Sequence, residues 1–223
     1  MVNNITYITY ADGEYYTEMS NSIFPQTSSG FDNSILYKKF EIDPIFSEKN
    51  KKILDSKTGA GYWIWKPYFI LNTLMSLGEG DIVFYLDLGD RISSEIKNFI
   101  KDKTIENGGF FLVEGLHQNS LWTKGDCFSI MGCEEERYKT AKQLEAGCCA
   151  FLKNDLSLKF VKEWIEYCQN YDVIASDCKG DNIQGFIEHR WDQSILTNLC
   201  IKYNIRTVPI ETMYRYISYN NFF

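Results

Sequence analysis

The tract Tyr85-Leu86-Asp87-Leu88-Gly89-Asp90 places two carboxylates directly after a run of apolar residues, 82–86. That run is hydrophobic throughout, which is typical of a strand buried on both faces of a parallel sheet. Carboxylates at the end of a buried strand are costly unless they face a cleft or hold a cation. We therefore predict that Asp87 and Asp90 bind a divalent metal, Mn²⁺ or Mg²⁺, which leaves coordination positions for phosphate oxygens. The alternative for Asp90 is a helix N-cap, whereas Asp87 lies too early to cap a helix.

A second polar tract, His189-Arg190-Trp191-Asp192-Gln193, lies where a loop meets a predicted helix. Its charged side chains are candidates for ligand binding. The structural alternative is that Asp192 only caps the helix and that Arg190 is only its ion-pair partner. Taken alone, the tract leaves both interpretations open.

A third tract, Gly61-Tyr62-Trp63-Ile64-Trp65-Lys66-Pro67, puts a lysine after two tryptophans at the start of a predicted helix. Helix starts bind anions well, because their backbone N–H groups lack partners within the helix. Packing alone would explain the tryptophans. It would not readily explain a lysine between them and the apolar face of the helix.

Alternating strand and helix patterns position these three tracts. Residues 4–10 alternate and end at Ala11-Asp12-Gly13, which indicates a strand that runs into a turn. The pattern predicts further strands over 109–113, 146–152 and 206–210, and helices over 65–75, 93–101, 134–144, 155–168 and 192–203. Asp155 is the predicted cap of the fourth helix. Residues 43–61 are predicted to be a connection with at most a short helix.

This alternation predicts an α/β fold in which a mostly parallel central sheet is flanked by helices. We expect the whole chain, 1–223, to form one domain, since 223 residues suffice for a single substantial core. Sheets of this kind bind ligands beyond the carboxyl ends of their strands. The residues that follow strands are therefore the candidate site.

Charge and composition narrow the class of partner. A net charge of -7 argues against a nucleic-acid partner, which requires a basic surface. It leaves a nucleotide possible, because a diphosphate needs only a few local cations or a metal held by carboxylates. The 7 cysteines show no regular spacing, and with only 2 histidines they do not suggest a zinc site. Reduced, buried thiols and hence a cytoplasmic location are expected.

The N-terminus has no basic segment followed by a long apolar stretch. We accordingly expect neither a signal peptide nor a membrane span.

Five tracts occur in order along the chain: GYWIWKPYFILNTL, GDIVFYLDLGD, LWTKGDCF, QLEAGCCAF and HRWDQSILTNL. Together they resemble a family of small bacterial and viral glycosyltransferase-like proteins with the GT-A fold of nucleotide-diphospho-sugar transferases, distantly similar to glycosyltransferase family 8. The resemblance implies a single GT-A, Rossmann-like domain. It implies transfer of a sugar from a nucleoside diphosphate sugar, expected to be a UDP-sugar, to a glycan or other hydroxyl acceptor, as in polysaccharide biosynthesis.

The resemblance also implies which residues bind the donor. In GT-A enzymes the first strand ends in residues that contact the nucleotide base, and these correspond to Tyr10, Ala11 and Asp12. A basic residue on the helix before the metal-binding strand lies against the donor, and Lys66, next to Trp65, corresponds to it.

Further along the chain, the family's Asp-Gln pair near the anomeric carbon corresponds to Asp192 and Gln193, with Arg190 beside it as a further donor contact. Its Asn-Ala-Gly segment, which lies beside the sugar, resembles Glu145-Ala146-Gly147, with Glu in place of Asn.

The chain departs from the family pattern at the metal site. The Asp-x-Asp motif maps to residues 87–89, so Gly89 stands where the second aspartate is expected and Asp90 follows it. The metal-binding histidine near the C-terminus of family 8 enzymes has no counterpart after His189.

The implied chemistry requires neutralisation of the departing diphosphate, for which the metal and Lys66 are the predicted groups. A neutral Gln193 makes a poor covalent nucleophile, which favours front-face attack with retention of configuration. An inverting reaction would need a carboxylate base, and Glu145 and Asp126 are the candidates. Trp122 and Lys124 are candidates for contact with the acceptor.

Two other functions remain open. A sugar-phosphate nucleotidyltransferase shares the sheet and the metal carboxylates, although it usually has a basic, glycine-rich loop where this chain has Ala-Asp-Gly-Glu. A catalytically inactive protein that binds sugar nucleotides or glycans would also explain the missing second aspartate.

Overall fold

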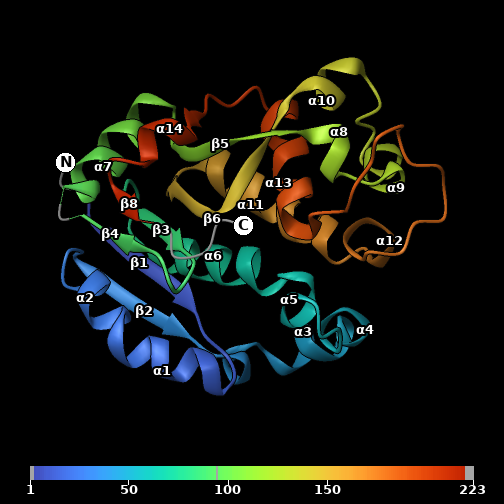
Figure 1. Cartoon of the computed structure of the whole chain (residues 1–223). Coiled ribbons are helices and arrows are strands. Elements are labelled where there is room, and N and C mark those ends of the chain that lie inside the picture. Colours follow the sequence, from blue (N-terminus) through green and yellow to red (C-terminus); the bar gives the residue numbers. More distant parts are fainter. Residues whose placement is uncertain (1–2, 94, 219–223) are drawn as a thin grey trace.

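The computed structural model describes residues 3–93 and 95–218 (Figure 1). Its centre is a 6-stranded sheet with the strand order β2-β1-β3-β6-β5-β7. The strands are β1 (Ile5–Tyr10), β2 (Asn33–Tyr37), β3 (Ile82–Leu86), β5 (Phe110–Gln118), β6 (Lys142–Leu152) and β7 (Val208–Pro209). Strand β6 is antiparallel to β3 and β5, and the other pairings in this sheet are parallel. The predicted α/β fold with a mostly parallel sheet is confirmed.

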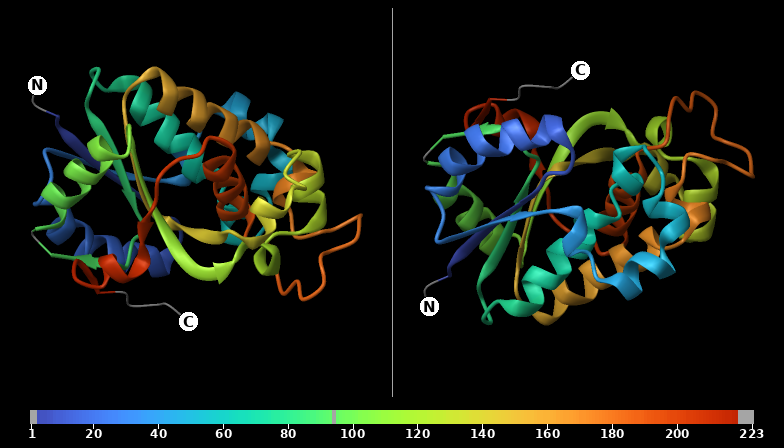
Figure 2. Two further views of the ribbon diagram at one scale, coloured as in Figure 1. Left: turned by 90° about the horizontal axis from the view of Figure 1, so that it is seen from above. Right: turned by 90° about the horizontal axis from the view of Figure 1, so that it is seen from below.

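Helices cover both faces of the sheet, as the two views in Figure 2 show. On one face α6 and α11 lie side by side and α13 packs on β6. The other face carries α7 and α14, together with α2 at the edge next to β1. The helices are α1 (Glu14–Ser22), α2 (Phe24–Ser28), α6 (Trp65–Ser76), α7 (Ile96–Glu106), α11 (Asp155–Cys168), α13 (Trp191–Lys202) and α14 (Ile210–Met213).

Short elements connect this framework. They are η1 (Lys39–Glu41), α3 (Pro44–Lys49), α4 (Lys51–Leu54), α5 (Gly59–Tyr62), α8 (Asn119–Trp122), α9 (Gly125–Ile130), α10 (Glu136–Thr140) and α12 (Tyr171–Ile174), with a separate two-stranded sheet of β4 (Arg91–Ile92) and β8 (Ile217–Ser218). Residues 43–61 are therefore more helical than expected. Asp43 caps α3, since its Oδ1 accepts hydrogen bonds from the backbone N–H groups of Ile45 at 2.9 Å and Phe46 at 3.0 Å.

The helix expected over 134–144 is wrong, because α10 is short and β6 begins at Lys142. Side chains of α13 hold the polar first half of β6 in place. The backbone N–H of Leu144 donates to Thr197 Oγ1 at 3.0 Å, and the Gln143 amide donates to Ser194 Oγ at 3.1 Å. The predicted cap of α11 is also wrong: the Asn154 side chain accepts from the backbone N–H of Ser157 at 2.8 Å, so Asn154 is the N-cap.

Element α5 is a left-handed turn. Five successive residues have positive φ: Gly59 (54°), Ala60 (51°), Gly61 (107°), Tyr62 (52°) and Trp63 (59°). A non-glycine residue in this region costs roughly 1–2 kcal/mol, so the surrounding packing must hold the turn. A Cβ on Gly59 would lie 2.0 Å from the Trp63 ring, so only glycine fits there.

All 7 cysteines are free, and 6 of them are buried. The expectation of unpaired thiols is confirmed. Among the described residues, no helix is long and apolar enough to cross a membrane.

His189, in the loop before α13, forms hydrogen bonds with Lys124 and Val173 through both of its ring nitrogens. The backbone N–H of Lys124 donates to His189 Nδ1 at 3.4 Å, so the ring proton is on Nε2, which donates to the Val173 carbonyl oxygen at 3.0 Å. Burial, together with the Lys124 charge, lowers the pKa of His189 to about 3. The ring is therefore neutral in the folded protein at neutral pH.

We predict that His189 makes the fold acid-sensitive. The unfolded chain binds a proton at this ring below pH 6.5, whereas the folded chain does so only near pH 3, so stability falls as the pH falls through this window. The loss amounts to about 1.4 kcal/mol per pH unit. His189→Gln retains an N–H donor for Val173 but does not titrate. Urea unfolding between pH 7 and 4 should therefore show a flatter pH profile for the variant than for the wild type, and parallel profiles would contradict the assignment.

Candidate active site

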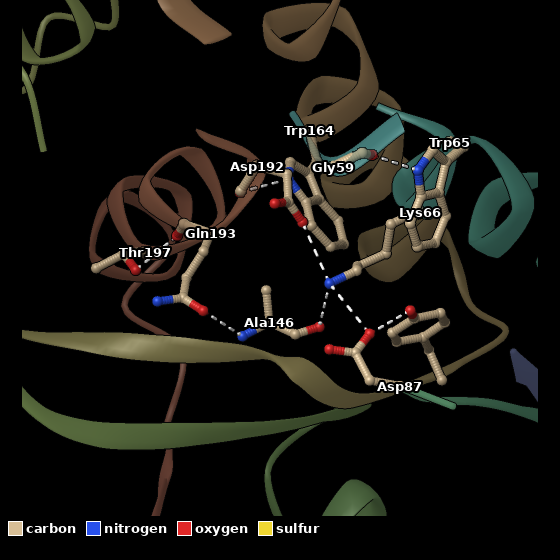
Figure 3. A network of polar contacts seen from close by, with 10 residues as sticks. Gly59, Trp65, Lys66, Asp87, Ala146, Trp164, Asp192, Gln193 and Thr197 are labelled. Atoms are coloured by element: carbon tan, nitrogen blue, oxygen red, sulfur yellow. Dashed lines mark hydrogen bonds and ion pairs between the residues drawn. The ribbon is translucent and has the colours of Figure 1, made fainter. Parts of the chain in front are cut away.

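Four elements meet at the carboxyl end of β3. The start of α6 brings Lys66, the residue after β3 is Asp87, the first turn of α13 brings Asp192, and β6 passes beside them with Ala146. Because β6 is antiparallel and longer than β3, its middle segment lies next to Asp87, whose backbone N–H donates to the Gly147 carbonyl oxygen at 2.8 Å. Figure 3 shows the Lys66 ammonium pointing between Asp87 and Asp192.

The Lys66 ammonium has three oxygen neighbours. Its Nζ donates to the Ala146 carbonyl oxygen at 3.1 Å, and it lies 3.6 Å from Asp87 Oδ1 and 3.6 Å from Asp192 Oδ2. The Lys66 side chain is 3% exposed and that of Asp192 is 4% exposed, whereas that of Asp87 is 47% exposed. The pair Lys66–Asp192 is therefore internal, and Asp87 connects it to the surface.

Electrostatics keeps this lysine charged. Burial acts to lower the pKa of Lys66, but the Asp192 and Asp87 carboxylates outweigh it and raise that pKa. The pKa of Asp192 is raised to about 7 by burial and by the Asp87 charge, against the opposing influence of Lys66. Two acids sharing one buried cation leave the cluster with a surplus of negative charge at neutral pH.

Close contacts fix the Asp87 side chain. The Tyr85 hydroxyl donates to Asp87 Oδ1, while Oδ2 lies against the backbone of Gly147. A Cβ on Gly147 would lie 2.7 Å from Asp87 Oδ2, so a glycine is required at this point of β6.

A cleft of about 500 Å³ opens above this cluster, at the carboxyl ends of β1 and β3. This volume is in the range typical of small-ligand sites. The cleft is bounded by the end of β1, helix α1, the segment 57–65 and the loop after β3. Its lining residues are Tyr10, Asp12, Tyr16, Met19, Lys57, Gly59, Ala60, Trp63, Trp65, Tyr85, Asp87, Leu88, Gly89 and Asp90.

One wall of the cleft is aromatic. Tyr10 and Trp65 are stacked with ring centroids 3.9 Å apart, and the Trp65 indole N–H donates to the Gly59 carbonyl oxygen at 2.9 Å. Trp63 packs against Trp191 with centroids 4.8 Å apart. The left-handed turn therefore links the cleft wall to the start of α13. Tyr10 and Trp65 are buried against each other, so Trp63, which is half-buried, is the ring of this wall with more surface available to a ligand.

Asp87 and Asp90, the two acids of the loop after β3, both line the cleft. Burial, with a contribution from the Asp87 charge, raises the pKa of Asp90 to about 7. A cation between two such carboxylates would relieve their repulsion, and their hard oxygen donors suit Mg²⁺ or Mn²⁺. Within the described residues no group of three or more His, Cys, Asp or Glu side chains gathers as a metal cage. The remaining ligands would have to be phosphate oxygens and water.

Several predicted residues lie outside the cleft lining. Ala11 is fully buried. The Gln193 amide is engaged on both sides, since its oxygen accepts from the Ala146 N–H at 3.1 Å and its nitrogen donates to Gln143 Oε1 at 3.0 Å. Arg190 lies over the Trp122 ring, 4.3 Å from its centroid.

The two candidate bases differ in their surroundings. Burial and the Asp87 charge raise the pKa of Glu145 to about 7, against the opposing charge of Arg190, so it suits proton transfer near neutral pH. Asp126 instead accepts from the backbone N–H groups of Lys179 at 2.6 Å and Gly180 at 2.9 Å. This carboxylate holds a loop, and neither Asp126 nor Glu145 is part of the cleft lining.

Two structural alternatives are wrong. Arg190 is the N-cap of α13, and Asp192 pairs with Lys66 instead of capping the helix. Asp90 does not cap α7, whose N-cap is Glu95. Lys124 is fully buried, with its ammonium donating to the carbonyl oxygens of Ala175 and Asp177, so it does not contact an acceptor.

A second hollow, of about 760 Å³, runs along the outer face of α11. Its charged residues, including Lys159, Lys162 and Glu163, come from one helix and do not converge on a point. The cleft above Lys66 combines several chain segments with buried charge and is the candidate active site.

The chain matches no protein-family model and no curated protein. Several solved structures are distantly similar to it, among them the following three. Mouse xyloside xylosyltransferase 1 in its apo form has 10% identity and a TM-score of 0.46, over 92% of this chain and 71% of that one. A protein assigned as a glucose-1-phosphate thymidylyltransferase from Bacillus anthracis, in complex with sucrose, has 8% identity and a TM-score of 0.38, over 92% and 86%.

The third, mannose-6-phosphate isomerase from Helicobacter pylori, has 10% identity and a TM-score of 0.37, over 94% of this chain and 92% of that one. Similarities this distant do not define a function for the chain, so its function is inferred from the residues of the cleft.

Sequence reasoning missed Lys57, the left-handed turn and the role of Gly147. A single lysine in a polar stretch carries no periodic signal. The two glycines at positions 59 and 61 were a sign of unusual backbone, although they did not specify its hand.

We predict that Lys66→Met destabilises the protein strongly at neutral pH. It leaves Asp192 buried without a cation, and breaking a buried pair in this way costs about 3–5 kcal/mol. Without the ammonium the pKa of Asp192 would rise further above 7, so the deficit relative to the wild type should be largest at alkaline pH and should shrink as the pH falls toward 7 and Asp192 becomes protonated in the variant.

The matched variant is Lys66→Met/Asp192→Asn, which removes both charges. Urea unfolding should show that the double variant recovers a large part of the loss and loses the pH dependence of the single variant. Equal destabilisation of both variants at all pH values would contradict the pairing.

Proposed function

We propose that the chain is a GT-A-type glycosyltransferase that transfers a sugar from a nucleoside diphosphate sugar to a hydroxyl acceptor. The observation that carries this proposal is the cleft at the carboxyl ends of β1 and β3, which combines an aromatic wall with the Asp87–Asp90 loop and the buried Lys66. An aromatic surface next to an acidic loop suits a ligand that has a flat base and a charged diphosphate.

In this proposal the ligand lies along the cleft. The base packs near Tyr10 and Asp12, where the first strand ends, and the sugar lies toward Asp87. Trp63 and Trp65 bound the side opposite the acidic loop. Asp192 contributes indirectly. It pairs with Lys66, and Lys66 in turn fixes the charge and the position of Asp87.

A divalent cation fits Asp87 and Asp90, and when bound it would neutralise charge on the diphosphate. The residues of the chain then have two tasks: to hold the acids in place and to exclude water from the reacting carbon. Gly147 and Tyr85 fix Asp87 for the first task. The stacked pair Tyr10–Trp65 forms one wall of the cleft and serves the second task, the exclusion of water.

During transfer the bond between the anomeric carbon and the diphosphate oxygen breaks, and its electron pair stays with the diphosphate. The acceptor oxygen bonds to that carbon and loses its proton, either to Glu145 in an inverting reaction or to the leaving phosphate in a retaining one. Glu145, with a pKa of about 7, is the carboxylate on β6 suited to the first route. Gln193 contributes to neither route directly, because its amide holds β6.

We predict that Asp87→Asn abolishes most of the activity in a chain that stays folded through the remaining Lys66–Asp192 pair, as circular dichroism would show. Loss of one group that stabilises developing charge costs about 100- to 1,000-fold in rate. The control is Asp102→Asn, on the exposed side of α7, which makes the same chemical change away from the cleft. Transfer and donor hydrolysis should be measured with a panel of nucleoside diphosphate sugars, with Mn²⁺, Mg²⁺ or EDTA.

The same panel separates the alternatives. Release of pyrophosphate from a nucleoside triphosphate and a sugar phosphate would identify a nucleotidyltransferase. Donor binding without turnover, under all metal conditions, would identify an inactive binding protein. Equal activity of the Asp87 and Asp102 variants would contradict the proposed site.

A further inference from the structure

The geometry of the cleft assigns the leaving diphosphate to a different lysine from the one that the sequence suggested. An ammonium group has three N–H donors. At Lys66 three oxygens already surround Nζ: the Ala146 carbonyl oxygen at 3.1 Å, and the Asp87 and Asp192 carboxylates at 3.6 Å each. With its side chain 3% exposed, Lys66 cannot reach a phosphate in the cleft without abandoning a buried carboxylate.

The cleft surface is otherwise acidic. Asp12, Asp87 and Asp90 line it, and among the described residues in its lining Lys57 is the cation. A diphosphate entering this cleft would meet carboxylates on one side. A positive charge elsewhere in the cleft lining is therefore needed in addition to any metal that the acids hold.

Backbone contacts fix Lys57 in this lining. Its carbonyl oxygen accepts from the Ala60 N–H at 3.4 Å, and the next residue, Thr58, donates its N–H to Ser56 Oγ at 3.3 Å. The left-handed turn 59–63 begins directly afterwards and is tied to α6 by the hydrogen bond from the Trp65 indole to Gly59. The strained turn thereby presents Lys57, Trp63 and the backbone of Ala60 to one ligand.

We propose that Lys57 binds the diphosphate of the donor and stabilises the negative charge that develops on it when the bond to the sugar breaks. Lys66 is then a positioning residue that holds Asp87. This inference rests on the proposed function, and it adds a residue that contacts the leaving group from a chain segment other than the loop of Asp87 and Asp90. Lys57 is exposed and flexible, so it can follow the diphosphate as it departs.

The test is a comparison of ligand affinity in Lys57→Met and in Lys49→Met. Lys49 is an exposed lysine in the last turn of α3, outside the cleft lining, and its replacement changes the net charge equally. Calorimetry would measure binding of a nucleoside diphosphate and of the matching nucleoside, each with Mg²⁺ and with EDTA. The base and the metal are chosen as those that bind the wild type most tightly.

We expect Lys57→Met to weaken diphosphate binding about tenfold or more, with and without metal, because a charge-assisted hydrogen bond is lost. Nucleoside binding should stay unchanged, Lys49→Met should match the wild type, and Lys57→Arg should recover much of the affinity. Steady-state kinetics of Lys57→Met should show a lower kcat together with weaker product inhibition by the nucleoside diphosphate.

Two results have distinct meanings. If the wild type binds no nucleoside diphosphate under any condition, the proposed function fails. If the wild type binds one and Lys57→Met binds it equally well, the proposed function stands and the role of Lys57 is wrong. If Lys57→Met and Lys49→Met weaken diphosphate binding equally, the effect comes from the net charge alone. This result would also contradict the assignment of Lys57.

Discussion

The buried ammonium of Lys66, held between Asp87 and Asp192, is the constraint on which the rest of the site depends. A lysine so fully removed from water is tolerated only when carboxylates neutralise it, and these carboxylates come from the end of β3 and the start of α13. The register of β6, which brings the Ala146 carbonyl to the same point, completes the contact. Four elements distant in sequence are therefore held at one position, and Asp87 is presented to the cleft by the packing beneath it.

The cleft wall above that cluster stores conformational strain. The left-handed turn 59–63 and Trp191, with φ of 44°, are both in an unfavourable backbone region, and the ring of Trp63 packs on that of Trp191. Strain of this kind persists where the surrounding structure determines it, often at ligand sites. Here it joins the aromatic wall of the cleft to the start of α13, which carries Asp192, so a ligand that contacts Trp63 would also affect the buried charge cluster.

The sequence was sufficient to predict the elements with strong periodicity, β1, β3, α6 and α11. Asp87 and Asp12 follow strands and line the cleft as expected, because carboxyl ends of parallel neighbours meet at one edge. It failed where tertiary contacts outweigh local pattern: the polar start of β6 is held as a strand by Ser194 and Thr197 of α13. The burial of Lys66 and the exposure of Lys57 could not be predicted either, because burial depends on the packing of elements that are distant in the chain.

The central claim is that the acidic loop after β3 faces a nucleoside diphosphate across the cleft. Crystals soaked with a nucleoside diphosphate and Mn²⁺, measured at a wavelength where manganese scatters anomalously, test it most directly. The account predicts an anomalous peak within about 2.2 Å of carboxylate oxygens of Asp87 and Asp90, with the diphosphate between it and Lys57. A diphosphate bound elsewhere, or a cleft that remains empty at saturating ligand, would contradict it.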